Sequence, residues 1–220
     1  MGKTSCFSAK RITRTINKNT IMYQEEKMKV LMLNGSRNAK GCTFTALSEI
    51  AKELTAAGID SEIVHIGKDA MNGNIDAAVN DVAAKLKESD GLVIGSPVYY
   101  ASASGEVVAF LDRLFWTAGD DLRHKPGAAV ASARRAGTTA TLDVLNKYIQ
   151  YCEMPLVTSN YWPMVHGFSP KDVMEDKEGL QIMHTLGRNM AWLLKCIEAG
   201  KKAGVQEPAA EQKVFTNFIR

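Results

Sequence analysis

The sequence predicts an α/β fold in which a five-stranded parallel sheet is covered by helices on both faces. From residue 28 onward, short apolar runs alternate with longer stretches whose apolar residues recur at helical spacing. The runs are nearly continuous rather than alternating, which is typical of strands buried on both faces. Strands that alternate with helices in this way are joined by crossover connections and therefore run parallel.

We expect five strands, at residues 29–33, 61–66, 91–94, 128–131 and 156–159. We expect five helices, at residues 43–57, 75–87, 104–116, 139–151 and 180–199. Two strand orders compete for this pattern, the flavodoxin-like order 2-1-3-4-5 and a Rossmann order. Five strands and the lack of a GxGxxG motif favour the flavodoxin-like order, and hence a three-layer sandwich.

The chain divides into three parts. Residues 1–27 are predicted to be a basic, disordered extension, with a targeting segment or an over-extended start as alternatives. Residues 28–200 form the predicted domain, and residues 201–220 an exposed C-terminal tail. The extension holds six Lys or Arg against two Glu and so carries a net charge of +4, whereas the whole chain carries +3 and the remaining residues −1. The remaining body is close to neutral, which argues against a nucleic acid as partner.

The spacing of the cysteines predicts that the protein has no cysteine-ligated metal site and that it occupies a reducing compartment. Cys6, Cys42, Cys152 and Cys196 are widely spaced and form no CxxC pair. A zinc site or an iron–sulfur cluster is therefore not expected. Unpaired cysteines suit a reducing cytosol, so we expect a cytoplasmic protein. No apolar run approaches the ~20 residues that span a bilayer, so no membrane contact is expected.

The first loop (residues 34–43) has the composition of an anion site. Gly35 and Gly41 permit tight turns, Ser36 and Thr43 offer hydroxyl groups, and the helix that follows presents free N–H groups. A Walker A loop needs four residues between its glycines and then a lysine. Here five residues intervene and Cys42 takes the place of the lysine. The loop therefore suits a phosphate outside a P-loop, or else a polar turn that only caps a helix.

Two further loops leave the same edge of the predicted sheet. The second loop (residues 95–105) holds Pro97, which we expect to stiffen its turn, and the aromatic pair Tyr99 and Tyr100. Aromatic rings at such a crevice suit a planar ligand, although tyrosines at a strand end are often only core-edge residues. The third loop (residues 132–139) places Arg134 and Arg135 at the opening of the same crevice. There they would contact a flavin edge or a nucleotide phosphate, or simply solvent.

These motifs resemble the NADPH-dependent FMN reductases, which have a flavodoxin-like fold. Their first loop typically reads Gly-Ser-Pro-Arg-x-x-Gly-Asn-Thr, whereas this chain has Gly35-Ser-Arg-Asn-Ala-Lys-Gly-Cys-Thr43. Four anchor positions are kept, and Arg37, Asn38 and Cys42 depart from the pattern. The second loop, Gly95-Ser-Pro-Val-Tyr-Tyr100, matches more closely. The resemblance covers roughly residues 29–200.

The resemblance implies an FMN-binding domain that transfers a hydride from NAD(P)H to flavin and then to a small acceptor, such as a flavin, a quinone or an azo compound. It implies no obligatory catalytic side chain and no metal. His166 is a candidate proton donor to the acceptor, or a residue that only orders its loop. The implied cofactor-binding residues are Ser36, Arg37, Asn38, Cys42, Thr43, Pro97, Val98, Tyr99, Tyr100, Ser132, Arg134 and Gly137.

Two alternatives to the enzyme remain. A flavodoxin-type electron carrier would have no nicotinamide site, but such carriers are usually strongly acidic and this body is not. A regulatory flavin-binding module is the other. Related reductases are commonly homodimers or homotetramers, and Phe215 and Phe218 of the tail would suit packing on a neighbouring subunit, unless the tail is solvated.

Overall fold

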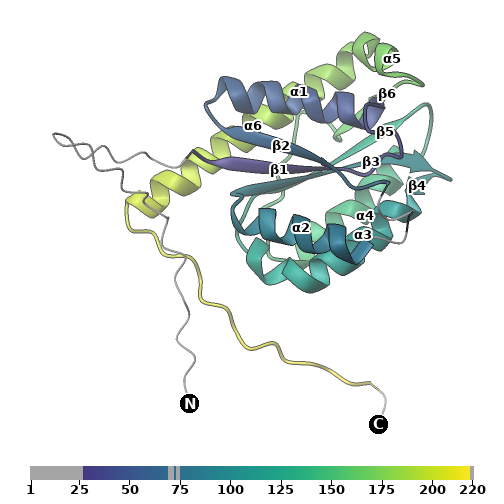
Figure 1. Cartoon of the computed structure of the whole chain (residues 1–220). Helices are drawn as coiled ribbons and strands as arrows, with labels where there is room; N and C mark the ends of the chain where they lie inside the picture. The colour runs from purple at the N-terminus through teal and green to yellow at the C-terminus, as the bar shows by residue number, and fades with distance from the viewer. Residues whose placement is uncertain (1–26, 69–71, 73–74, 219–220) are drawn as a thin grey trace, which may run out of the picture.

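The computed structural model describes residues 27–68, 72 and 75–218, so the expectation for the basic extension lies almost wholly outside the described residues. The parallel sheet has the order β2-β1-β3-β5-β6, with β4 paired antiparallel to β3 (Figure 1). Without the short β4, this is the predicted order 2-1-3-4-5, which is confirmed. The strands are β1 (Lys29–Asn34), β2 (Asp60–His65), β3 (Gly91–Tyr99), β4 (Ser102–Ala103), β5 (Gly127–Ala133) and β6 (Met164–His166).

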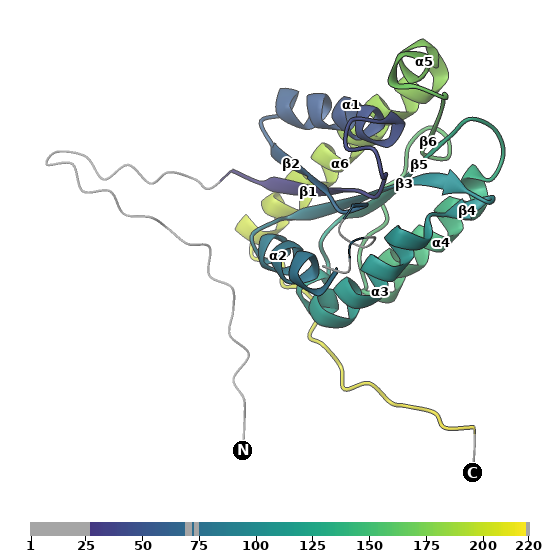
Figure 2. The same ribbon diagram turned by 45° about the vertical axis from the view of Figure 1, so that its right-hand side comes forward.

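Helices form the two outer layers, as Figures 1 and 2 show. Helices α1, α5 and α6 cover one face of the sheet, and α2, α3 and α4 cover the other. A short 3-10 turn, η1 (Gly119–Leu122), follows α3. The helices are α1 (Cys42–Ala56), α2 (Ile75–Lys87), α3 (Gly105–Ala118), α4 (Thr138–Tyr151), α5 (Pro170–Glu175) and α6 (Lys177–Lys202). Within the described ranges, none of them has the length and apolar character that a membrane crossing needs.

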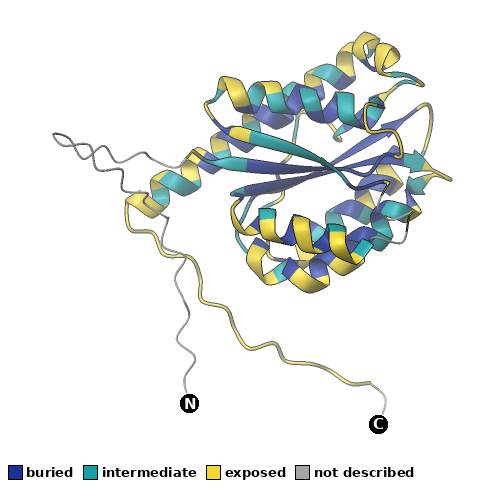
Figure 3. Cartoon of the chain, in the orientation of Figure 1, coloured by how far each residue is buried: buried dark blue, intermediate teal, exposed yellow. Residues whose placement is uncertain are grey.

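Strand β1 lies between the two helical layers, which is why its apolar run is continuous. Val30 and Met32 belong to the core under α1 and α6, whereas Leu31 and Leu33 belong to the core under α2, α3 and α4. All four side chains are fully buried. Successive side chains of a strand point to opposite faces, so a strand between two helical layers needs apolar residues at every position. Figure 3 shows the same burial along the central strands.

The fifth strand lies later in the chain than the sequence predicts. Residues 156–159 were expected to form it, but only Leu156 forms an isolated bridge, with Gly127. The segment then turns to α6, where the Ser159 hydroxyl donates to the Ile182 carbonyl at 2.7 Å. Pairing with β5 resumes at Met164–His166. The prediction was wrong because the backbone of this segment meets β5 only at Gly127, whose N–H donates to Pro155 O and whose carbonyl accepts from Val157 N, before the chain leaves the sheet.

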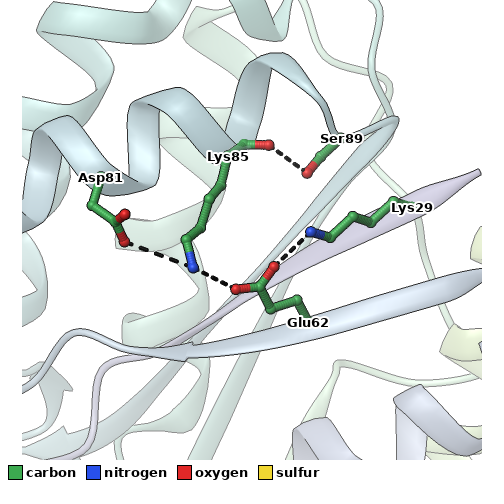
Figure 4. A network of polar contacts seen from close by, with 5 residues as sticks. All are labelled: Lys29, Glu62, Asp81, Lys85 and Ser89. Carbon is green, nitrogen blue, oxygen red and sulfur yellow. Dashed lines mark hydrogen bonds and ion pairs between the residues drawn. The ribbon is translucent and has the colours of Figure 1, made fainter.

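A polar network fastens β2 to its neighbours at the end of the sheet opposite the three loops (Figure 4). The Glu62 carboxylate accepts from Lys29 Nζ of β1 at 2.6 Å and from Lys85 Nζ of α2 at 2.5 Å. Lys85 Nζ also lies 3.7 Å from Asp81 Oδ2. The two lysine hydrogen bonds lower the pKa of Glu62. Exposed ion pairs contribute little singly, and this network joins three elements.

A buried carboxylate joins α1 to α6. Glu49 of α1 is only 5% exposed, and its two oxygens accept from Lys52 Nζ at 2.6 Å and bond to His184 Nε2 of α6 at 2.9 Å. Burial acts to raise the pKa of Glu49, but the hydrogen bonds to Lys52 and His184 outweigh it and lower the pKa. The charged form is therefore favoured more in the folded than in the unfolded chain, so Glu49 contributes stability that is lost as pH falls through its folded pKa.

We predict that Glu49→Gln lowers the free energy of unfolding by about 1–3 kcal/mol at pH 7, because charge-assisted hydrogen bonds are lost. The difference from wild type should shrink below the ordinary glutamate pKa of about 4.5. Urea unfolding measured from pH 7 to pH 3 tests this, with the exposed Glu175→Gln as control. The prediction would be contradicted if the free energies of unfolding of wild type and Glu49→Gln differed by the same amount at every pH in this range.

Candidate functional site

The three loops singled out in the sequence meet at the carboxyl edge of β1, β3 and β5. The first loop approaches β3 so closely that its glycine is required. Gly35 N donates to Gly95 O at 2.9 Å, and a Cβ on Gly35 would lie 1.9 Å from a methyl carbon of Val107 in α3. A Cβ on Gly95 would in turn lie 2.8 Å from Thr43 Cγ2 of α1. The two glycines thus let α1 and α3 approach the middle of the sheet from opposite faces.

Side chains at the ends of two strands fix the shape of the first loop. Asn34, the fully buried last residue of β1, accepts from Ser36 N and donates to Ala39 O, both at 3.1 Å. The His65 ring, at the end of β2, bonds through Nε2 to Ser36 O at 2.6 Å. Ser36 Oγ accepts from Asn38 N at 3.2 Å. The loop is therefore held from both sides before any ligand binds.

Helix α1 begins without a protein partner for its first N–H groups. In the part of the chain that the structure describes, Gly41 at its N-cap provides no side-chain hydrogen bond, and no acid occupies the first turn. Helix α4 also begins at a glycine, Gly137, with φ +104 and no side-chain cap. By contrast, α3, α5 and α6 are capped by Ser104, Ser169 and Asp176. Free N–H groups at a positive dipole end attract an anion.

A buried hydrogen bond joins the first loop to the third. Thr43 Oγ1 lies 2.8 Å from Ser132 Oγ, and both residues are buried. Cys42 Sγ donates to Gly167 O, at a distance of 3.7 Å. Burial raises the pKa of the Cys42 thiol, so it is protonated at neutral pH. Three of the predicted residues thus converge on the start of α1.

The second loop is a β-hairpin rather than a turn centred on its proline. Strands β3 and β4 pair from Val98 to Ala103, which leaves Tyr100 and Ala101 as the two-residue turn. Both have positive φ, 51° and 60°, as a type I′ turn requires. Pro97 instead lies buried inside β3, in register with Ser132 of β5, so the expectation that it stiffens the turn was wrong.

The third loop supports the hairpin from the side. A Cβ on Gly137 would lie 2.6 Å from Cα of Ala101, so only glycine allows this approach. Tyr99 is partly exposed beside the hairpin turn, and Tyr100 is fully exposed. Arg134 and Arg135 are exposed in the same loop. Pro97, Val98, Tyr99, Tyr100, Ser132, Arg134 and Gly137 therefore lie at one edge, as predicted.

Two predicted residues of the first loop point elsewhere. Arg37 donates through Nε to Glu106 Oε1 of α3 at 2.7 Å, and its guanidinium lies 5.7 Å from the centre of the Tyr99 ring. The Asn38 side chain accepts from Lys40 N within the loop. In this arrangement the Arg37 side chain is committed to an acid, and the Asn38 side chain to shaping its own loop.

His166 is the last residue of β6, in register with Ala133 of β5. Its backbone N–H donates to Asp176 Oδ2 at 2.7 Å, and its Nδ1 lies 3.9 Å from the same oxygen. Tyr161 and Trp162 precede β6, which begins only at Met164, and they stack edge to face on each other.

Sequence reasoning missed three side chains that shape the site: Asn34, His65 and Glu106. Asn34 is a polar residue at the end of an apolar strand, and His65 ends the neighbouring strand, so the topology places both at this edge. That position was a usable signal. Glu106 carried none, because an acid in the first turn of a helix is common for reasons of the helix dipole alone.

Curated relatives and solved structures show what the chain is similar to. An iron–sulfur flavoprotein of Methanocaldococcus jannaschii is 28% identical over 78% of this chain and 100% of its own length. An iron–sulfur flavoprotein of Methanosarcina thermophila is 23% identical over 79% and 99%.

Solved structures share the fold. A flavodoxin from the domain Archaea has a TM-score of 0.57 at 18% identity, over 76% of this chain and 99% of its own. RosB, solved with bound 8-demethyl-8-formylriboflavin-5'-phosphate, has a TM-score of 0.63 at 14% identity, over 88% and 92%. A flavone reductase has a TM-score of 0.62 at 18% identity, over 78% and 64%.

The family model described as NADPH-dependent FMN reductase matches residues 28–169, which is more than half of the chain and includes all three loops. The matched segment runs from the first strand through the hairpin and the α4 N-terminus to the end of β6. The chain therefore belongs to the NADPH-dependent FMN reductase family.

Proposed function

We propose that this protein is an FMN-dependent oxidoreductase that oxidises NAD(P)H and passes the electrons to a small acceptor, such as a flavin, a quinone or an azo compound. Membership of the family supports a flavin-dependent oxidoreductase. The observation that carries the proposal is the uncapped start of α1, which lies beside the hydroxyl-bearing residues Ser36 and Thr43. The start of α1 lies at the same edge of the sheet as the hairpin that carries Tyr99 and Tyr100.

The residues at this edge fit FMN. The first N–H groups of α1 and the Ser36 hydroxyl are donors of the kind that bind a phosphate, and no acid of the first turn opposes it. Residues of the hairpin and of the third loop would hold the ring system. When bound, FMN supplies the redox chemistry, and the protein supplies binding, orientation and electrostatics. None of this needs a catalytic acid, base or nucleophile from the chain.

The described cysteines do not fit an iron–sulfur cluster of the kind that the relatives' names imply. Cys42 begins α1, Cys152 follows α4, and Cys196 is exposed on α6. In the described ranges, no three His, Cys, Asp or Glu side chains gather as metal ligands. A cluster needs four ligands, usually thiolates. Because this chain spans nearly the whole length of two such relatives, the difference lies in its residues. We therefore derive no electron path through a cluster.

The first test of the proposal is the cofactor and its reduction. We predict that the purified protein binds FMN and that NADPH or NADH added without oxygen bleaches the bound flavin rapidly. Visible absorption followed by stopped flow measures both. Bleaching only by a partner reductase would favour the flavodoxin-type carrier. A protein that stays colourless and cannot be reconstituted with FMN would overturn the proposed function altogether.

A second prediction concerns the phosphate. Ser36→Ala with Thr43→Ala should weaken FMN binding by about 1–3 kcal/mol, since hydrogen bonds to a charged group are lost. Riboflavin, which lacks the phosphate, should be affected less. Ser48→Ala is a matched control, because its hydroxyl bonds to Phe44 O within the same helix. If the double variant binds FMN as tightly as wild type, the phosphate is held by backbone amides alone.

A third prediction concerns assembly, for which we propose a homodimer. Trp116 of α3 and Tyr151 of α4 are largely exposed, and so are Phe215 and Phe218 of the tail. The tail passes the same end of the molecule, because Lys213 Nζ lies 5.0 Å from the centre of the Tyr151 ring. Exposed aromatic residues in such number are typical of an interface.

We therefore expect a dimer by light scattering, and we expect Trp116→Arg to weaken it, because a charge would replace apolar contact area. Trp192→Arg on α6 is the matched control, since that tryptophan is also exposed but lies on the other helical layer. A wild-type protein that stays monomeric at high concentration would refute the homodimer.

A further inference from the structure

The contact between Arg37 and Glu106 gives the first loop a feature that the family pattern lacks, since proline is usual at the position of Arg37. Arg37 directly follows Ser36, yet its side chain extends to α3. Its Nε donates to Glu106 Oε1 at 2.7 Å, and its Nη2 contacts the same oxygen. The guanidinium also lies 5.7 Å from the centre of the Tyr99 ring. The cation is thus held between the first loop and the hairpin.

Glu106 remains a carboxylate although it is largely buried. Its side chain is 12% exposed, in the first turn of α3. Burial acts to raise the pKa of Glu106, but hydrogen bonds from the backbone, from Arg37 and from Ser104 outweigh it and lower the pKa. The start of a helix also favours a negative charge. The protein therefore keeps a fixed anion at this position at neutral pH.

That anion stands close to the loop that would receive a phosphate. Val107, the next residue of α3, packs directly on the first loop, where a Cβ on Gly35 would lie 1.9 Å from its methyl carbon. A largely buried carboxylate so near to the loop would repel an anionic cofactor, because repulsion between charges strengthens as water is excluded. In this structure the Arg37 guanidinium balances the carboxylate.

We propose that Arg37 is a positioning residue that neutralises Glu106, rather than a ligand of the phosphate, and that this neutralisation keeps the first loop attractive to FMN. The inference rests on the proposed function, because it concerns binding of FMN to that same site. Removing the arginine alone should therefore weaken FMN binding, whereas removing the acid alone should not.

A double-mutant cycle tests the inference through flavin affinity rather than activity. Arg37→Ala, Glu106→Gln and the double variant are each stripped of cofactor and titrated with FMN and with riboflavin, followed by flavin fluorescence. We expect Arg37→Ala to weaken FMN binding about tenfold, because removing one partner leaves a buried charge uncompensated. Riboflavin affinity should change less than about twofold, because it carries no phosphate charge to be repelled.

The double variant distinguishes neutralisation of Glu106 from direct contact between Arg37 and the phosphate. Removing the carboxylate as well should return FMN affinity to within about threefold of wild type, and Glu106→Gln alone should bind FMN at least as tightly as wild type. The loss in Arg37→Ala should shrink as salt is raised, because partly exposed charges are screened.

A second ion pair serves as a matched control. Arg188 of α6 and Glu53 of α1 lie 3.3 Å apart with side chains 55% and 23% exposed, against 56% and 12% for Arg37 and Glu106. The corresponding variants Arg188→Ala and Glu53→Gln should leave FMN affinity unchanged.

Three other outcomes would overturn the inference. If the loss of FMN affinity in Arg37→Ala persists in the double variant, Arg37 binds the phosphate directly. If FMN and riboflavin lose affinity equally, the pair is only a structural brace. If wild-type protein binds FMN and Arg37→Ala binds it equally well, the charge of Glu106 has no influence on the site. A wild-type protein that binds neither flavin would instead remove the proposed function, and the inference with it.

Discussion

The close approach of the first loop to the middle of the sheet is the constraint on which the site depends. Gly35 bonds to Gly95 and lies against Val107, and Gly95 lies against Thr43 and Leu47 of α1. Where two strands run side by side, a side chain at either glycine would push a helix away from the sheet. With hydrogen there, the start of α1 and the first turn of α3 come near the same loop from opposite faces, and the arrangement of the candidate site follows from that.

Charge is distributed unevenly along this edge, and the distribution has a physical logic. Helices α3, α5 and α6 have N–H groups of their first turns satisfied by the side chains of Ser104, Ser169 and Asp176. The helices that start at the first and third loops, α1 and α4, begin with glycine and carry no acid in the first turn. Where the structure describes the chain, α1 and α4 thus start with backbone N–H groups that are available to a ligand, whereas buried polar groups generally have partners within the protein.

The fold was largely predictable, because its signal is local and repeated. Strands β1, β3 and β5 are runs of apolar or small residues that are buried at nearly every position, as a parallel sheet covered on both faces requires. The edge strand β2 mixes polar and apolar residues and is only partly buried. The fifth strand was not predictable, because Met164–His166 offers only three residues. Residues 156–159 begin with a similar apolar pair but meet β5 only at Leu156 before Ser159 bonds to α6. Helix α5 was missed although its Ser169 and Asp172 form a capping box that the sequence displays.

The site was predictable in its loops and less so in its side chains. The topology places the loops that follow β1 and β5 at one edge of the sheet. Ser36, Thr43 and Ser132 lie at that edge, where Thr43 bonds to Ser132. The role of Arg37 was not predictable, because it depends on Glu106, which lies 69 residues later in the chain. A motif shows which residues reach an edge, but pairing across two loops is decided by tertiary contacts that no local pattern records.

The protonated thiol of Cys42 has a chemical consequence for a protein of this family. The thiolate is the form of cysteine that oxidants attack, and a helix start commonly lowers a thiol pKa. Here burial, together with the nearby Asp172 carboxylate, raises the pKa of Cys42 instead, and the sulfur is occupied by the Gly167 carbonyl. The sulfur atom is thereby kept in the less reactive thiol form, so the protein can carry a small, polarizable, half-buried residue at the start of α1 that oxidants attack only slowly.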